Sequence, residues 1–248
     1  MKRLFWFALI GVVLLSLVLA GCAPKPTKVR IATDATWPPF ESVNEQTKEI
    51  EGFDIDLMNA IAERAGLEIE FVNVGWDALL AGIAQCQYDA AISAMTITEE
   101  RKKQFLFSDP YFGAGQLVTV RKDNTDIRNR DDLRGKVVGA QIGTTGSFEV
   151  EKIEGATLKT YDDIGLAYQD LINGQIDAVV ADNPLVLGYV GKNPDKLKTV
   201  GEVFTEENYG IAVCKTKADL LEKINSGLKA VKEEGLIEEL VEKWLSSQ

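Results

Sequence analysis

The chain has 248 residues, of which 46% are hydrophobic and 26% are charged, and its formal net charge is −11. This composition excludes a disordered chain and is typical of a globular protein with one large or two small domains. The negative charge argues against nucleic acid or an anionic membrane surface as a partner. Because histidine is absent, Ser–His catalysis, Cys–His catalysis and histidine-ligated zinc are excluded.

The first 22 residues have the pattern of a bacterial lipoprotein signal. Lys2 and Arg3 precede an apolar run over 4–19, and Cys22 closes a Leu-Ala-Gly-Cys box of the kind in which the cysteine is kept and acylated. The run is short for a membrane span, and a plain signal anchor is the alternative. We therefore expect a signal peptide over 1–22, a tether over 23–28 and a body outside the cytoplasmic membrane, in the periplasm or on the outer face.

Strands and helices alternate along the remaining chain in two series. The first series predicts strands over 29–33, 67–74 and 89–93, and helices over 53–65, 76–85 and from 99. The second predicts strands over 116–120, 136–141, 157–161 and 178–181, and helices from about 148, 164 and 183. A last strand is expected over 207–214 and helices over 218–244, while the two prolines exclude regular structure over 34–40. The alternation predicts parallel pairing with right-handed crossovers.

Polar residues gather at the points where predicted strands end. Asp34, the segment 93–96, the segment 143–147 and Asp182 each follow the carboxyl end of a strand. In open α/β sheets this edge is where ligands bind. Four separate segments therefore predict one ligand site.

Arg101 is the first candidate within that site. Thr98 is a predicted helix N-cap, followed by Glu99 and Glu100 in the first turn. An arginine in this turn opposes the helix dipole by roughly 0.3–1 kcal/mol, so another role must explain it. A forked guanidinium beside hydroxyls and free N–H groups suits a small carboxylate. The alternative is that 101–104 form a solvated face.

Other candidates have equally ordinary alternatives. The segment 143–147 lacks the pattern of a phosphate-binding loop, but its N–H groups could bind a carboxylate. Trp37 and Trp76 are either core aromatics or a clamp for a planar or cationic group. Asp34 and Asp182 are either turn caps or partners of an ammonium group and a side-chain donor.

Seven motifs in order resemble one known family, the family 3 bacterial extracytoplasmic solute-binding proteins, which are polar amino-acid receptors of ABC importers. The motifs are Thr33-Asp34, Trp37-Pro38-Pro39-Phe40-Glu41, Gly52-Phe53-Asp54-Ile55-Asp56-Leu57, Thr96-Ile97-Thr98-Glu99-Glu100-Arg101, Phe107-Ser108-Asp109-Pro110-Tyr111, Gly143-Thr144-Thr145-Gly146 and Tyr209-Gly210-Ile211-Ala212. The resemblance runs over 29–244. It implies an α/β two-lobed periplasmic-binding-protein fold of type II, in which each lobe is a mostly parallel sheet flanked by helices and the ligand lies in the cleft. Lobe 1 is expected over 29–114 and 208–248, and lobe 2 over 115–207.

The resemblance also implies roles for the backbone groups of an amino-acid ligand. Arg101 is expected to bind the α-carboxylate, helped by Thr96 and the region of Thr145. Ser93, Ala94 and Asp182 are expected to bind the α-ammonium group. Ala94 stands where some members have the second of two serines, so its contact can only be through the backbone.

For the ligand side chain, the resemblance places Trp37 and Trp76 on its two sides and Asp34 at its far end. Asp34 accepts hydrogen bonds and repels a carboxylate, so we expect L-arginine first and glutamine second. The expected partners are the ligand, ABC permease subunits and a membrane reached only through the lipid anchor; we expect a monomer with no cofactor, metal or nucleic acid.

An enzyme of the same fold, similar to cyclohexadienyl dehydratases, is the alternative function. The matched loops offer Glu99 and Glu100 as further acids, but helix capping explains both, so we do not expect an enzyme.

Two further features are predicted from the residues. Cys86 and Cys214 lie in an export compartment that permits disulfides, and they are either joined to each other or are two buried thiols. The lobes are expected to close about 113–116 and 207–210.

Overall fold

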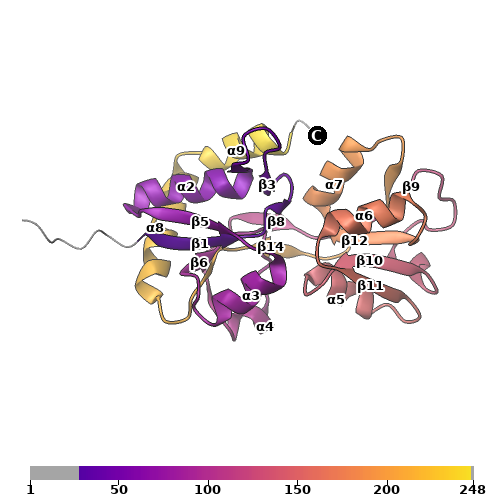
Figure 1. The fold of residues 1–248 in the computed structure, drawn as a ribbon, viewed down its shortest axis with the longest axis horizontal. Coiled ribbons are helices and arrows are strands. Elements are labelled where there is room, and N and C mark those ends of the chain that lie inside the picture. Colours follow the sequence, from indigo (N-terminus) through magenta and orange to yellow (C-terminus); the bar gives the residue numbers. More distant parts are fainter. Residues whose placement is uncertain (1–27, 247–248) are drawn as a thin grey trace, which may run out of the picture.

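The computed structural model describes residues 28–246 and shows two lobes side by side (Figure 1). The predicted signal peptide, and Cys22 with the acylation expected of it, lie outside the described residues. Within 28–246 no helix is long and apolar enough to cross a membrane.

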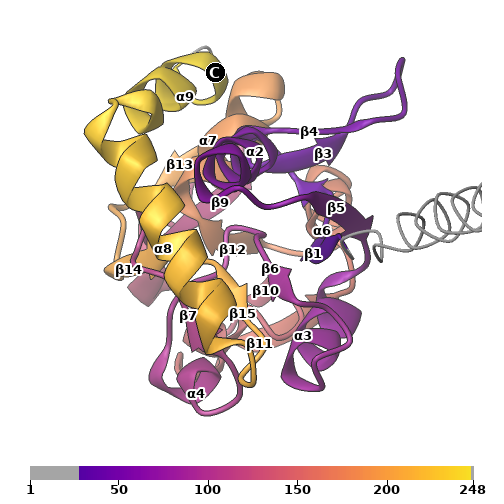
Figure 2. The same cartoon turned by 90° about the vertical axis from the view of Figure 1, so that its left-hand side faces the viewer.

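Lobe 1 is built on a sheet with the strand order β5-β1-β6-β15-β7. Its strands are β1 (Val29–Thr33), β5 (Ile69–Asn73), β6 (Ala90–Ala91), β7 (Leu106–Phe107) and β15 (Ala212–Val213). Its helices are α2 (Phe53–Ala65), α3 (Trp76–Ala84), α4 (Glu99–Lys102), α8 (Ala218–Glu233) and α9 (Leu236–Trp244). Strand β1 pairs in parallel with β5 and β6, whereas β15 is antiparallel to β6 and β7. Helix α8 packs along α2 and crosses this lobe (Figure 2).

Lobe 2 repeats this arrangement with the strand order β11-β10-β12-β9-β13. Its strands are β9 (Gln116–Arg121), β10 (Val137–Gln141), β11 (Thr157–Tyr161), β12 (Ala178–Asp182) and β13 (Leu197–Val200). Its helices are the 3₁₀ turn η1 (Arg130–Leu133), α5 (Thr145–Glu151), α6 (Ile164–Ile172) and α7 (Asn183–Lys192). In each sheet three neighbouring strands are parallel and the fourth is antiparallel. The fold class that the resemblance implies is therefore confirmed.

A two-stranded connection lies between the two sheets (Figure 1). Here β8 (Phe112–Ala114) pairs antiparallel with β14 (Glu207–Tyr209). The Phe40 ring packs edge to face on Phe112 and Tyr209, with centroids 5.2 and 5.3 Å apart. A Cβ at Gly115 would lie 2.1 Å from the Thr205 carbonyl oxygen, so the two crossing segments approach each other too closely for a side chain.

Two predictions about the strands are wrong. The single strand expected over 207–214 divides into β14 and β15, which belong to different sheets. The chain turns between them at Gly210, where a Cβ would lie 2.7 Å from the Ile97 side chain. The segment 34–40 contains β2 (Thr36–Trp37), which pairs with β3 (Glu41–Val43), and β3 pairs with β4 (Ile50–Glu51). The strand fits because Pro38 and Pro39 come after it and need not donate to its ladder.

Other boundaries shift by a few residues. Helix α5 begins at Thr145 rather than near 148, because the Thr144 side chain caps it by accepting from Ser147 N at 3.3 Å. The strand expected over 89–93 is only β6, since Ala94 adopts a positive φ of 42° and turns the chain away from the sheet.

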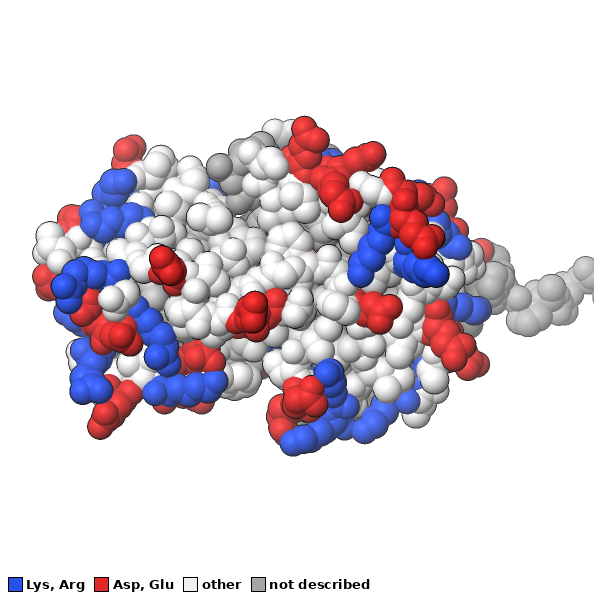
Figure 3. Space-filling view, turned by 180° about the vertical axis from the view of Figure 1, so that it is seen from behind, with Lys and Arg blue, Asp and Glu red and all other residues white. Residues whose placement is uncertain are grey.

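Charged side chains gather toward both ends of the molecule on its rear face (Figure 3). Lys and Arg lie there among Asp and Glu, and the middle of this face is mostly uncharged with isolated acidic side chains. This face therefore has no continuous basic surface.

A disulfide joins Cys86 to Cys214, 128 residues apart in sequence. It links the chain just after α3 to the end of β15. We expect a Cys86→Ala/Cys214→Ala variant to have a free energy of unfolding lower by roughly 2–5 kcal/mol, because the bridge restricts the unfolded chain. Denaturant titration measures this difference. Reaction of both cysteines with a thiol reagent in denatured, unreduced wild-type protein would show that no such bridge forms.

Candidate functional site

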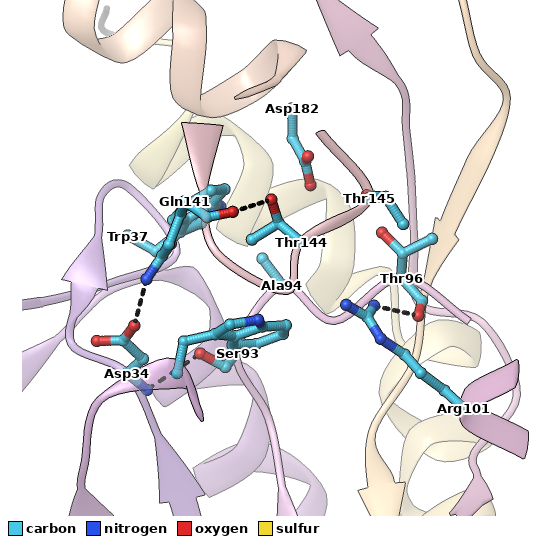
Figure 4. A pocket seen from close by; sticks show the side chains of 11 residues that line it. Asp34, Trp37, Ser93, Ala94, Thr96, Arg101, Gln141, Thr144, Thr145 and Asp182 are labelled. Atoms are coloured by element: carbon cyan, nitrogen blue, oxygen red, sulfur yellow. Dashed lines mark hydrogen bonds between the residues drawn. The ribbon is translucent and has the colours of Figure 1, made fainter. Parts of the chain in front are cut away.

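A cavity lies between the two lobes, where strand ends from both sheets face each other (Figure 4). It is lined by Asp34, Trp37, Trp76, Ser93, Ala94, Thr96, Arg101, Gln141, Thr144, Thr145 and Asp182. All nine residues predicted as ligand contacts are in this set. The structure therefore brings them together at one place, and their contact with a ligand stays a prediction.

Asp34 and its partners form one side of the cavity. The Asp34 carboxylate accepts from Thr36 Oγ1 at 2.9 Å and from Gln141 Nε2 at 3.0 Å. Gln141 ends β10 and so belongs to lobe 2, which makes this hydrogen bond a link between lobes. Burial raises the pKa of Asp34, and the two hydrogen bonds oppose that shift. An acceptor held in this way suits a ligand group that carries N–H donors.

Arg101 lies on the opposite side of the cavity from Asp34 (Figure 4). Thr98 caps α4 by accepting from Arg101 N at 3.1 Å. The guanidinium is buried over the Trp76 ring, 5.2 Å from its centroid, and donates to Thr96 O at 2.7 Å and Gly143 O at 3.2 Å. Among the described residues, two of its five N–H donors are engaged in this way. Because Arg101 lines the cavity, the other donors are available for a carboxylate there.

The alternative of a solvated face fails for Arg101 and holds for the residues after it. Lys102 and Lys103 are exposed and pair with Glu99 and Glu100 at 2.7 and 2.6 Å. Burial lowers the pKa of Arg101 to about 10, against the opposing charges of Asp182 and Glu207. The guanidinium therefore stays charged at neutral pH.

Asp182, at the end of β12, is the second buried carboxylate of the cavity. It accepts from Gln116 Nε2 at 2.6 Å and from the Tyr209 hydroxyl. Burial and the charge of Glu207 raise the pKa of Asp182 to about 7. An ammonium group beside it would favour the ionised form.

Ser93 and Ala94 are supported from behind by a buried carboxyl pair. Ser93 Oγ accepts from Asp34 N at 3.0 Å and donates to Glu41 Oε1 at 2.8 Å. Ala94 N donates to Asp54 Oδ2 at 2.7 Å. Glu41 Oε2 and Asp54 Oδ1 are buried and have no hydrogen-bond donor among the described residues, so we expect the pair to share one proton. This pair fixes the turn in which Ala94 has its positive φ.

The raised pKa values of Glu41 and Asp54 give stability a defined pH dependence. Burial raises the pKa of Asp54 to about 7 and raises that of Glu41 well above its ordinary value. The folded state therefore binds protons more tightly than the unfolded chain, and the free energy of unfolding from this pair falls as pH rises through 7. We expect Glu41→Gln to reduce the loss of stability between pH 5 and pH 8 by about 1 kcal/mol or more.

Denaturant titrations at both pH values measure this effect. The matched control is Glu45→Gln, which neutralises an exposed carboxylate and should leave the pH dependence unchanged. Equal pH dependence in wild-type protein and Glu41→Gln would show that the pair holds no shared proton.

Four polar residues near the cavity were not among the predicted contacts. Gln141 and Thr144 line it, and Gln116 and Glu207 lie behind it. Gln141 ends a strand two residues before the predicted loop 143–147, so its position at the ligand edge could have been recognised. No local pattern identifies Gln116 or Glu207.

Known proteins resemble the chain over nearly all of the described residues. An ancestral arginine-binding protein bound to arginine is 45% identical, with a TM-score of 0.84, and the match covers 88% of this chain and 97% of that chain. An ancestral arginine-binding protein bound to glutamine is 44% identical, also with a TM-score of 0.84, over 89% of this chain and 98% of that chain. An L-cystine-binding protein of Escherichia coli strain K12 is 34% identical over 88% of this chain and 82% of its own length.

The family model described as bacterial extracellular solute-binding proteins, family 3, matches residues 29–247. It thus covers both sheets, the connection between them and every residue that lines the cavity. The chain belongs to the bacterial extracellular solute-binding proteins of family 3.

Proposed function

We propose that this protein is the substrate-binding component of an ABC importer and that it captures L-arginine first and glutamine second. The charge arrangement of the cavity carries the proposal. Asp34 and Asp182 contribute two buried carboxylates, and Arg101 contributes one guanidinium. Arginine presents the complement, with two cationic groups and one carboxylate. The α-carboxylate faces Arg101, the α-ammonium group faces Asp182, and the side chain extends toward Asp34.

The side-chain end of the cavity distinguishes arginine from other amino acids. Trp37 and Trp76 offer aromatic faces to a flat cation, which contributes roughly 0.5–2 kcal/mol depending on desolvation. A ligand with a second carboxylate, such as glutamate or cystine, would place that group toward Asp34. Glutamine brings an N–H₂ donor to Asp34 but leaves the charge of Asp34 uncompensated. This explains why we place glutamine second to arginine.

Calorimetry across the amino acids tests the proposal. We expect micromolar or tighter binding of arginine, about −8 kcal/mol or better, and weaker binding of glutamine. Strong binding of glutamate or leucine without any response to arginine or glutamine would overturn it. Mass spectrometry should find the ligand released unchanged, whereas turnover of a cyclohexadienyl acid would establish an enzyme instead.

Ligand binding should draw the lobes together about 113–116 and 207–210. Each lobe contributes one end of the cavity, so a filled cleft favours the closed arrangement. Solution scattering should therefore show a smaller radius of gyration after arginine is added. Identical scattering with and without the ligand would contradict closure, and glutamate serves as the control that should not change the shape.

The family is extracytoplasmic, and we propose that the lipid on Cys22 anchors the protein outside the cytoplasmic membrane. The anchor keeps the receptor near the permease subunits to which it delivers its ligand. Two lobes are proposed to move against each other. Lobe 1 consists of 29–114 and 208–248, and lobe 2 consists of 115–207.

A further inference from the structure

Glu207 lies behind the cavity, in the connection between the lobes, and is nearly buried at 9% exposure. Four donors reach its carboxylate. Oε2 accepts from Thr96 Oγ1 at 2.6 Å and from Thr145 Oγ1 at 2.8 Å. Oε1 accepts from Gln116 Nε2 and Thr205 Oγ1, both at 2.9 Å. A single oxygen of Glu207 therefore holds one hydroxyl from each lobe.

These two hydrogen bonds decide what the threonines can offer to a ligand. Thr96 and Thr145 both line the cavity, and a hydroxyl has only one hydrogen to donate. Because both hydrogens point at Glu207, the two oxygens present only lone pairs to the cavity. Lone pairs accept from an ammonium group and repel a carboxylate. The Thr96 hydroxyl held in this way does not suit a carboxylate, so the help expected of Thr96 at the α-carboxylate would have to come from its backbone.

A second contact fixes Glu207 in place. The Gln116 amide is fully buried and donates from Nε2 to Asp182 Oδ1 at 2.6 Å as well as to Glu207. It thereby holds two carboxylates beside each other. Asp182, Thr96 and Thr145 surround one region of the cavity (Figure 4), which consequently has acceptors on several sides.

We propose that Glu207 is a positioning residue that turns the Thr96 and Thr145 hydroxyls into fixed acceptors and so selects ligands with an α-ammonium group. The inference rests on the proposed function and deepens it. Since the two threonines come from different lobes, the acceptor pair is complete only when the lobes meet. Glu207 therefore couples closure to the presence of the ammonium group.

The test uses Glu207→Gln and three ligands in calorimetry with displacement titration. The ligands are arginine, 5-guanidinopentanoate, which lacks the α-ammonium group, and agmatine, which lacks the α-carboxylate. The Oε1 side of Glu207 faces the Gln116 Nε2 donor, so the glutamine oxygen is expected on that side and its NH₂ group on the side of the two threonines. The threonine oxygens then accept from this NH₂ group, and their hydroxyl hydrogens turn toward the cavity. We expect arginine and agmatine to bind about 10-fold or more weakly and 5-guanidinopentanoate to change by less than about 3-fold.

Two further variants complete the test. Glu206→Gln removes the same charge from the exposed neighbour and should leave the affinities for all three ligands unchanged. Thr96→Val removes one acceptor directly, so it should weaken arginine and agmatine but not 5-guanidinopentanoate, even if Glu207→Gln does not fold.

The possible failures are distinguishable. Equal weakening of all three ligands by Glu207→Gln and by Thr96→Val, or no weakening of arginine by either, would overturn the role of Glu207 alone. Absence of arginine binding by wild-type protein would overturn the proposed function, and this inference with it.

Discussion

Arg101→Ala should weaken the binding of every amino-acid ligand by about 2–5 kcal/mol, the usual cost of truncating one partner of a buried, hydrogen-bonded charge pair. The reason is that the α-carboxylate is common to all of them and Arg101 is the cation of the cavity. The guanidinium is buried over Trp76, so water screens it poorly. Calorimetry with arginine and with glutamine measures the effect, and both ligands should lose a similar amount.

The matched control for this variant is Lys102→Ala. Lys102 lies next to Arg101 on α4, but its ammonium group is exposed and pairs with Glu99 at 2.7 Å. We expect its removal to leave ligand affinity within about 0.5 kcal/mol of the wild-type value, as is usual for a surface substitution. If Arg101→Ala bound arginine as tightly as wild-type protein, the carboxylate would lie elsewhere in the cavity.

The sequence predicts the parts of the site that depend on short segments. Asp34, Ser93 and Asp182 each lie at the end of a buried apolar strand, and such positions gather at the ligand-binding edge of their sheet. Arg101 is recognisable because a cation in the first turn of a helix needs a separate explanation. The family resemblance then assigns the roles, which neither composition nor spacing could supply.

The residues that were missed depend on contacts between distant segments. Gln116 and Glu207 are 91 positions apart in sequence, and Gln141 and Asp34 are 107 apart. Neither pair has a local pattern, because the Gln141–Asp34 hydrogen bond joins the two lobes and the Gln116–Glu207 hydrogen bond joins the two ends of 115–207. Glu41 and Asp54 likewise come together only through burial beneath the Ser93 turn. A single sequence therefore reveals the edge where the ligand binds. It does not reveal the polar network behind that edge equally well.

Several two-residue and three-residue strands were missed for a different reason. Strands such as β2 and β7 are too short for a period of two to be distinguished from a buried helix. Their pairing is set by neighbours in the sheet rather than by their own residues. Strand β8 likewise pairs only with β14, in the connection between lobes.

Asp34→Asn should invert the preference between arginine and glutamine. The substitution keeps the size of the side chain and an acceptor for Thr36 or Gln141, but it removes the charge that faces the far end of the ligand. Arginine would then bring a guanidinium into a buried region with no anionic partner, and its binding should weaken by about 2–5 kcal/mol. Glutamine carries no side-chain charge, so we expect its affinity to change by less than about 1 kcal/mol.

The pH dependence gives an independent measurement of the same group. Because burial raises the pKa of Asp34, acidification should protonate it sooner than an exposed aspartate and should weaken arginine more than glutamine. In Asp34→Asn that difference between the two ligands should disappear. Asp195→Asn, which neutralises an exposed carboxylate outside the cavity, should leave the difference between the two ligands unchanged. Equal weakening of both ligands by Asp34→Asn would mean that Asp34 holds a group common to all amino acids, and the side chain would then have to extend in another direction from Arg101.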